Sequence, residues 1–307
     1  MNQTISIIIP VCNERGNLPV LIDAIKQVMQ PLPYNYTYVF VEDSSTDGTL
    51  DYIKQMALQQ KNILFIALTR SFGHQNAIKA AIDKIDADAV IMMDGDMQHP
   101  PTLLPTLIDL WQQGNDIVYT IRKEQQNLPF IKRKTSSIFY KLINRLSDIE
   151  IEDGSADFRL IDRKVAVAFK NFTEDDLFWR GLVKWLGYKQ IGIEYEPAER
   201  VIGSSKYTYK RLMQLALKGI TSFSVKPLSI AVYLGFTFSL LSTLYIPYVL
   251  FSLLFEHPIS GWASMIVTIA FFGGLQLMIL GIIGMYLGKL FMQSKHRPHY
   301  IIKESNL

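Results

Sequence analysis

The amino-acid sequence predicts an α/β protein in which a mostly parallel, doubly wound sheet is followed by two helices that cross a membrane. Short runs of β-branched and aromatic residues alternate with helical stretches from residue 1 to about residue 125, as in chains built of βαβ units. Two long runs without a charged residue lie near the C-terminus. Because 49% of the 307 residues are hydrophobic, the chain has apolar sequence beyond the needs of one globular domain.

Five runs in the first part of the chain have the composition of buried strands. Each is short and rich in valine, isoleucine, tyrosine or phenylalanine, and a helical stretch separates it from the next. The expected strands are residues 5–9, 38–41, 63–67, 89–93 and 117–119. Open sheets of this kind bind ligands at the carboxyl ends of their strands.

The most informative site lies at the end of the fourth expected strand. Asp94-Gly95-Asp96 follows that strand directly and precedes Gln98. Hard carboxylate oxygens favour Mg²⁺ or Mn²⁺, and such a metal would bridge the phosphates of a nucleotide and act as a Lewis acid toward a departing diphosphate. The alternative is a solvated turn that happens to contain two carboxylates.

The loops after the first and second expected strands are also polar. Residues 10–14 form the first loop, and residues 42–49 form the second and supply a candidate helix cap. Asp43 is expected to hydrogen-bond the base or ribose of a nucleotide, with a simple turn and cap as the alternative. The sequence contains neither a G-x-G-x-x-G fingerprint after the first strand nor a G-x-x-x-x-G-K-[ST] loop, which disfavours a dinucleotide oxidoreductase or a P-loop NTPase.

The two uncharged runs, residues 228–255 and 262–288, predict membrane-spanning helices. At about 1.5 Å per residue each is about 40 Å long, more than the roughly 30 Å of a hydrocarbon core. A buried core hairpin is the alternative. The chain therefore divides into a domain at residues 1–225, a membrane hairpin at 226–292 and a tail at 293–307.

The charges around the hairpin predict its orientation. Basic residues flank both runs, whereas the connection holds Glu256 and His257 but no lysine or arginine. This asymmetry places both termini and the large domain in the cytoplasm, on the cytoplasmic (inner) membrane. No signal peptide is expected, because the first apolar segment is short and lacks a basic lead. The single cysteine, Cys12, excludes an internal disulfide and agrees with a reducing compartment.

Two further segments are basic and amphipathic. Residues 129–146 and 207–223 are expected to lie in the headgroup layer of an anionic leaflet. The alternative is ordinary packing on the domain with a solvated basic face. Glycines at 273–274 and between 281 and 288 would let helices approach closely, which favours a homo-oligomer.

Several motifs, in order along nearly the whole chain, resemble those of one enzyme family. They are IIIPVCNE at residues 7–14, VEDSSTDGT at 41–49, MDGDMQHP at 93–100 and DFRL at 157–160. The chain thereby resembles the inverting family-two glycosyltransferases of GT-A fold. LTRSFGH at 68–74, ERVIGSSKY at 199–207 and the two C-terminal runs resemble the polyisoprenyl-phosphate branch, which includes bactoprenol glucosyltransferases and dolichyl-phosphate mannose synthases.

The resemblance implies roles for the residues that match family motifs. A divalent metal, Mg²⁺ or Mn²⁺, would be held by Asp94, Asp96 and Gln98. The nucleotide sugar would contact Pro10, Glu14, Val41, Asp43, Asp94, Gln98 and Arg122. The acceptor phosphate would contact Arg122, Arg200, Ser205 and Lys206. The catalytic residues would be Asp157, Asp96, Arg200 and Lys206. Cys12 and Ser71 depart from the family pattern.

Two of these assignments have explicit alternatives. Arg200 and Lys206 flank a glycine-containing loop that is flexible enough to close over an anion, and the alternative is a basic loop resting on lipid headgroups. Asp157 is expected to orient the acceptor or the sugar, while a role as general base stays open. Its alternative is a structural carboxylate paired with Arg159 or Arg163.

The resemblance implies transfer of a hexose, with inversion, from a nucleotide sugar to a polyisoprenyl phosphate at a membrane. Glucose from UDP-glucose and undecaprenyl phosphate are the favoured substrates, and no nucleic-acid partner is expected. A different donor such as GDP-mannose is the first alternative. A processive polysaccharide synthase is disfavoured because the chain lacks a Gln-x-x-Arg-Trp motif. A catalytically silent membrane scaffold would not need Asp94, Asp96, Arg200 and Lys206 together.

Overall fold

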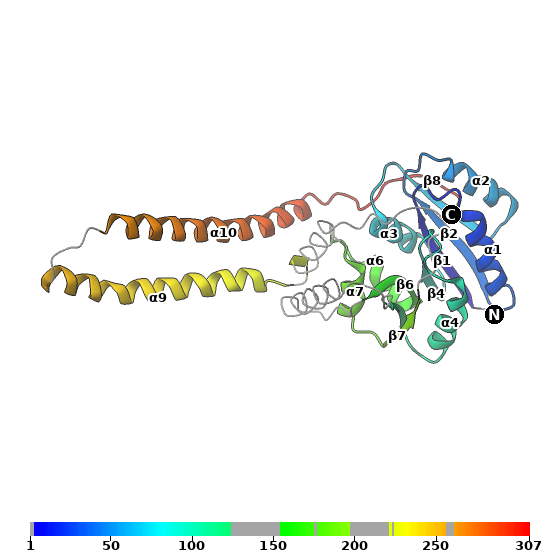
Figure 1. Ribbon diagram of the computed structural model, residues 1–307. Coiled ribbons are helices and arrows are strands. Elements are labelled where there is room, and N and C mark those ends of the chain that lie inside the picture. Colours follow the sequence, from blue (N-terminus) through cyan, green and yellow to red (C-terminus); the bar gives the residue numbers. More distant parts are fainter. Residues whose placement is uncertain (1–2, 124–153, 175–176, 197–220, 223, 256–260) are drawn as a thin grey trace.

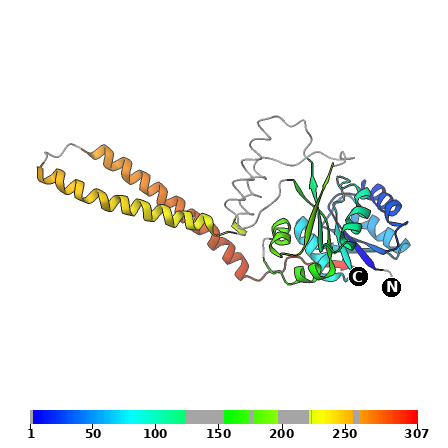
Figure 2. The same ribbon diagram turned by 90° about the horizontal axis from the view of Figure 1, so that it is seen from below.

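A computed structural model describes residues 3–123, 154–174, 177–196, 221–222, 224–255 and 261–307. It consists of an α/β domain and a long helical hairpin that projects away from it (Figures 1 and 2). Nearly all of the expected amphipathic segments, 129–146 and 207–223, lie outside the described residues.

The described strands form one eight-stranded sheet in the order β7-β5-β6-β4-β1-β2-β3-β8. The strands are β1 (Thr4–Val11), β2 (Asn35–Glu42), β3 (Ile63–Leu68), β4 (Ala89–Met92), β5 (Ile117–Arg122), β6 (Ser155–Asp162), β7 (Gln190–Tyr195) and β8 (Ile302–Ser305). All five expected strands are present, and β4, β1, β2 and β3 are parallel neighbours. The register pairs Val11 with Glu42, so β1 and β2 end at the same edge.

Three strands were not expected from the sequence. β6 lies between β4 and β5 and is antiparallel to both, whereas β7 is parallel to β5 and β8 is antiparallel to β3. The sheet is therefore mixed, although mostly parallel. β6 matters for the site because it carries Asp157 and Arg159 into the middle of the sheet.

Helices cover both faces of the sheet, because successive strand residues point to opposite sides. Side chains of β1 such as Ile7 and Ile9 pack with helices α1, α2 and α4, whereas Ile8 packs with α3, α6 and α7. The helices are α1 (Leu18–Met29), α2 (Thr49–Gln59), α3 (His74–Lys84), α4 (Leu104–Gln112, after a 3-10 turn at Pro101–Leu103), α6 (Arg163–Lys170) and α7 (Trp179–Trp185).

The hairpin consists of α9 (Lys226–Phe255) and α10 (Trp262–Ser294), which lie side by side in both views (Figures 1 and 2). In the part of the chain that the structure describes, one helix is long and apolar enough to cross a membrane, Ser264–Ser294. In α9 the apolar segment Lys226–Leu241 is shorter than such a span requires. One candidate span is thus found where two were predicted.

The segment at 293–307, expected only as a tail, contains strand β8. After α10 the chain returns to the α/β domain, where β8 adds to the edge of β3. The Asn306 side chain accepts a hydrogen bond from the Phe65 backbone N–H at 2.6 Å and donates to the Ile63 carbonyl at 3.1 Å. The hydroxyl of Tyr300 donates to Asp83 at 3.0 Å. The sheet is therefore completed by a segment that follows the hairpin in the sequence.

Candidate active site

A cavity of about 190 Å³ opens at the carboxyl ends of β1, β2 and β4. It is lined by Pro10, Val11, Cys12, Glu14, Asp43, His74, Ala77, Asp94, Gly95 and Asp96. Five predicted site residues are thus brought together. Val41 is not among the lining residues, because it is fully buried in β2 and packs in the core.

The loops after β1 and β2 are tied to each other by hydrogen bonds. The Asn13 side chain accepts from the Thr46 backbone N–H at 2.8 Å, and the Asn13 backbone N–H donates to the Ser45 hydroxyl at 3.0 Å. Glu42 accepts a short hydrogen bond from the Ser45 backbone N–H. Asn13 and Ser44 have φ values of 61° and 62°, a left-handed conformation that is uncommon outside glycine. These hydrogen bonds hold the loops after β1 and β2 together, and we call the pair the fixed double loop.

Asp43 holds the loop between β3 and α3. Its carboxylate, in a residue only 5% exposed, accepts from the Ser71 hydroxyl at 2.8 Å and from the backbone N–H groups of Phe72 and Gly73 at 2.7 and 3.0 Å. Ser71, which departs from the family pattern, thus supplies one of the hydrogen bonds to this carboxylate. In this structure Asp43 positions the neighbouring loop, in addition to lining the cavity.

Two histidines that sequence reasoning did not single out contact Asp94. Nε2 of His74, the first residue of α3, lies 2.7 Å from Asp94 Oδ1. Nδ1 of His99 accepts from the Asp94 backbone N–H at 2.9 Å, so Nε2 carries the proton when this ring is neutral. That nitrogen lies 3.7 Å from Asp94 Oδ2. Both histidines lie within the motifs at 68–74 and 93–100, but the motifs do not indicate these contacts.

The surroundings of His74 and Asp94 favour the charged form of both side chains. Burial lowers the pKa of His74, but the hydrogen bond that His74 donates to Asp94 and the charges of Asp94 and Asp157 outweigh burial and raise the pKa to about 9. Burial would raise the pKa of Asp94, yet the field of His99 and the contact with His74 hold it below its usual range. Asp94 is therefore an ionised carboxylate beside a cationic imidazole.

The turn that contains Asp96 is tight. Asp96 Oδ1 accepts from the Gln98 backbone N–H at 3.1 Å, and Met97 between them has a φ of 64°. Gly95 fits closely, because a Cβ there would lie 3.1 Å from Val11 Cγ1. The amide oxygen of Gln98 lies 3.5 Å from Nη1 of Arg122 at the end of β5. Gln98 and Arg122 therefore extend the cluster beyond the cavity lining.

The donor atoms of this turn fit a hard divalent cation. Within the described ranges no group of three His, Cys, Asp or Glu side chains is arranged to hold a metal. Mg²⁺ commonly uses one or two protein carboxylates together with water and substrate phosphates, and Mn²⁺ accepts the same oxygen ligands. Asp94 and Asp96 offer two carboxylates, and Gln98 offers an amide oxygen.

Asp157 lies in an ion-pair cluster next to this site. Nε of Arg180 donates to its Oδ1 at 3.1 Å and Nη2 to its Oδ2 at 3.3 Å, and Nη2 of Arg159 lies 3.5 Å from Oδ1. Of the two arginines that the alternative interpretation named, Arg159 is the one that pairs with Asp157, whereas Arg163 contacts Asp86 at 2.6 Å.

The charges around Asp157 keep it ionised. Burial would raise the pKa of this carboxyl, but Arg180, His74 and Arg159 together hold it far below its usual range. Burial lowers the pKa of Arg159 to about 10 despite the charge of Asp157. Arg180 was not predicted as a site residue, since it lies on α7 and meets β6 only in the folded chain. Arg200, Ser205 and Lys206 lie outside the described residues.

Comparisons with known proteins agree with this arrangement. The model of glycosyl transferase family 2 matches residues 6–168. The chain is 39% identical over 301 residues to the uncharacterized glycosyltransferase YkcC of Bacillus subtilis (strain 168), covering 98% of this chain and 93% of that protein. It is also 39% identical over 300 residues to the bactoprenol glucosyl transferase of Shigella phage SfV, covering 97% and 98%.

A solved structure shares the fold. The mannosyltransferase PcManGT from Pyrobaculum calidifontis, in complex with GDP-Man and Mn²⁺, superposes with a TM-score of 0.51 at 17% identity, over 72% of this chain and 63% of that chain. At this identity the likeness shows the fold alone, and it agrees with the GT-A architecture expected from the sequence.

Proposed function

The chain belongs to glycosyl transferase family 2, and from this premise we propose that it transfers glucose from UDP-glucose to a polyisoprenyl phosphate such as undecaprenyl phosphate. The observation that carries the proposal is the turn of Asp94 and Asp96 in a cavity at the strand ends, beside the loops that hold Glu14 and Asp43. Relatives named bactoprenol glucosyl transferase match nearly the full chain, which supports the sugar and the lipid acceptor.

Different residues are assigned to the nucleotide sugar and to the acceptor phosphate. The nucleotide lies against the fixed double loop, near Pro10, Glu14 and Asp43. Asp94, Asp96 and Gln98 would hold Mg²⁺ or Mn²⁺, which stabilises negative charge on a leaving diphosphate when it is bound. Arg122 lies beside Gln98 and supplies a guanidinium to the same phosphates. The loop residues Arg200, Ser205 and Lys206 are proposed to hold the acceptor phosphate.

The reaction is a displacement with inversion at the anomeric carbon. An acceptor phosphate oxygen forms the new bond to that carbon, while the bond from carbon to the diphosphate oxygen breaks and its electron pair leaves with the diphosphate. A lipid phosphate is already ionised at neutral pH, so no proton must be removed from the nucleophile. The low pKa of Asp157 makes it a poor base, and we assign it an orienting role together with Arg180.

The proposal also includes a two-span membrane hairpin with both ends on the cytoplasmic side. Its support is the antiparallel contact of α9 with α10, where the Phe238 ring meets those of Phe271 and Phe272 at 5.7 and 5.6 Å between centroids. Large apolar side chains of α10 such as Met265 and Leu277 are more than half exposed, which suits a lipid environment. The active site would then face a leaflet that contains the acceptor.

The experiment is a transfer assay with the purified full chain, undecaprenyl phosphate and Mg²⁺ or Mn²⁺. Each of several labelled nucleotide sugars is tested, with and without EDTA, and label in the lipid phase is measured. The proposal expects label from UDP-glucose that EDTA abolishes. Label from GDP-mannose alone would replace the donor, and no lipid labelling from any donor by folded protein would contradict the reaction itself.

A further inference from the structure

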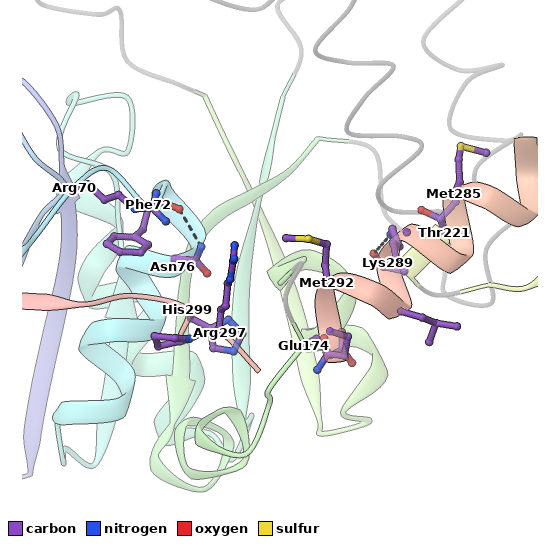
Figure 3. A pocket seen from close by; sticks show the side chains of 15 residues that line it. Arg70, Phe72, Asn76, Glu174, Thr221, Met285, Lys289, Met292, Arg297 and His299 are labelled. Carbon is purple, nitrogen blue, oxygen red and sulfur yellow. Dashed lines mark hydrogen bonds between the residues drawn. The ribbon is translucent and has the colours of Figure 1, made fainter. Parts of the chain in front are cut away.

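A second cavity, of about 670 Å³, lies between the α/β domain and the C-terminal turns of α10. Figure 3 shows its walls: Arg70, Phe72 and Asn76 come from the α/β domain, and Met285, Lys289 and Met292 come from α10. Arg297 and His299, on the segment that leads to β8, close the space between them. Its volume is within the roughly 300–1,000 Å³ typical of small-molecule sites.

The lining combines positive charge with apolar surface. The lining contains three cationic side chains, those of Arg70, Lys289 and Arg297, and one carboxylate, that of Glu174. Cationic side chains therefore exceed anionic ones by two. The Arg70 guanidinium stacks on the Phe72 ring at 3.9 Å and donates one hydrogen bond to the Ser71 carbonyl, which leaves further N–H groups for a ligand. Met285, Leu290 and Met292 form the apolar part. A ligand with an anionic head and an apolar tail fits this pattern.

The cavity lies at the level of lipid headgroups if α10 spans the membrane. As a helix of 33 residues, α10 is about 50 Å long at about 1.5 Å per residue, which exceeds a hydrocarbon core of roughly 30 Å. Its last turns therefore extend beyond the hydrocarbon, and basic residues at such helix ends meet lipid phosphates.

The cavity is separate from the candidate active site. The two cavities share no lining residue. The segment from Phe72 to Ala77 lies between them, with Phe72 and Asn76 on one side and His74 and Ala77 on the other. An occupant of the larger cavity would therefore lie outside the cavity that contains Asp94 and Asp96.

We propose that this cavity binds the headgroup of an anionic glycerophospholipid, with Arg70 and Arg297 holding its phosphate and the methionines of α10 contacting its acyl chains. The bound lipid would fill the space between the α/β domain and the hairpin. It would also contact the loop that Asp43 holds at the active site. The site is thus a lipid site in addition to the one that the acceptor needs.

Binding is tested with the purified full chain in a neutral detergent. Native mass spectrometry measures retention of phosphatidylglycerol, phosphatidylcholine and undecaprenyl phosphate by the wild type and by an Arg70→Gln/Arg297→Gln variant. The matched control is Lys295→Gln/Lys303→Gln, which removes two exposed charges outside the cavity. We expect one tightly retained phosphatidylglycerol, weakened about tenfold or more in the cavity variant and less than about twofold in the control.

A second pair of variants leaves the charges in place. Gly288 lines the cavity and Gly284 does not, and a Cβ at either would meet open space. Gly288→Phe should weaken phosphatidylglycerol retention, whereas Gly284→Phe should leave it unchanged. Equal retention of phosphatidylcholine, equal weakening in the control variants, or displacement of phosphatidylglycerol by undecaprenyl phosphate from the same residues would overturn the proposal.

Discussion

At the scale of single residues, the ion pairs of Asp157 are the strongest electrostatic feature of the site. Arg180 binds both of its oxygens, and Arg159, whose side chain is only 2% exposed, lies 3.5 Å away. Removing the carboxylate would take an anionic partner away from two guanidinium groups. Asp157 is therefore expected to stabilise the fold as well as to orient a substrate.

We predict that Asp157→Asn lowers the free energy of unfolding by about 2 kcal/mol, because a partly buried charge-assisted pair is broken. The measurement is thermal or urea unfolding of the purified full chain. Arg163→Gln is the control. It breaks only the exposed pair with Asp86, whose side chains are 54% and 65% exposed, and should change stability by less than about 0.5 kcal/mol. Equal effects of the two substitutions would contradict the prediction.

The same pair predicts how stability depends on pH. The folded-state pKa of Asp157 is lowered, so its contribution is present above the unfolded-state value of about 4 and is lost only as pH falls toward the folded-state value. The charge of Asp157 also helps raise the pKa of His74 to about 9, so the test is made below the unfolded-state histidine value of about 6.5, where His74 stays protonated in both proteins. The stability difference between the wild type and Asp157→Asn should therefore be the same at pH 6 and pH 5. A difference that shrinks at pH 5 would show that Asp157 titrates in this range.

Part of the site could be predicted from the sequence and part could not. Asp94, Asp96, Glu14 and Asp43 could be predicted because each follows a strand, and parallel strands end at one edge. His74 and Arg180 could not, since their contacts depend on how α3 and α7 pack against β4 and β6. Val41 was predicted to contact the nucleotide; its side chain is buried on one face of β2, whereas Phe40 is buried on the other, and the contact stays a prediction.

At the scale of elements, the parallel strands could be predicted and the antiparallel ones could not. The five expected strands are nearly continuous apolar runs, as buried parallel strands are. β6 contains the charged residues Asp157 and Arg159, so its sequence lacks the continuous apolar pattern of a buried strand. The ion pairs of these residues are evident only in the structure. β8 has only four residues, of which Lys303 and Glu304 are charged, so its sequence does not predict a strand.

The edge formed by β3 and β8 is expected to contribute to stability. We predict that Asn306→Ala costs about 1–2 kcal/mol, because the Phe65 N–H and the Ile63 carbonyl lose their partner at the end of the strand. Lys303→Ala in the adjacent strand β8, at an exposed position, should have little effect. Thermal unfolding of both variants measures this cost. A loss of stability that is no larger for Asn306→Ala than for Lys303→Ala would contradict the prediction.

At the scale of the whole molecule, the α/β domain is not a continuous segment of the chain. The hairpin of α9 and α10 is inserted between the main part of the domain and its edge strand β8. The two helices of the hairpin are thereby preceded and followed in the sequence by parts of the same sheet.

The proposed two-span topology predicts where added labels can react. A membrane-impermeant maleimide should label a His257→Cys variant, built in a Cys12→Ser background, in intact cells. The native Cys12, the single cysteine of the chain and an exposed one, should react only after permeabilisation. Protection of the His257→Cys variant in intact cells, or labelling of Cys12 without permeabilisation, would contradict a hairpin with both ends in the cytoplasm.

The central claim is that the turn of Asp94 and Asp96 carries glucosyl transfer to lipid, and its most direct test is the turnover of an Asp94→Asn/Asp96→Asn variant. Label from UDP-glucose entering undecaprenyl phosphate is measured beside Asp86→Asn, a substitution at an exposed carboxylate away from the site. The account predicts a loss of about 100-fold or more in the double variant and wild-type turnover in the control. Undiminished lipid glucosylation by a folded double variant would contradict it.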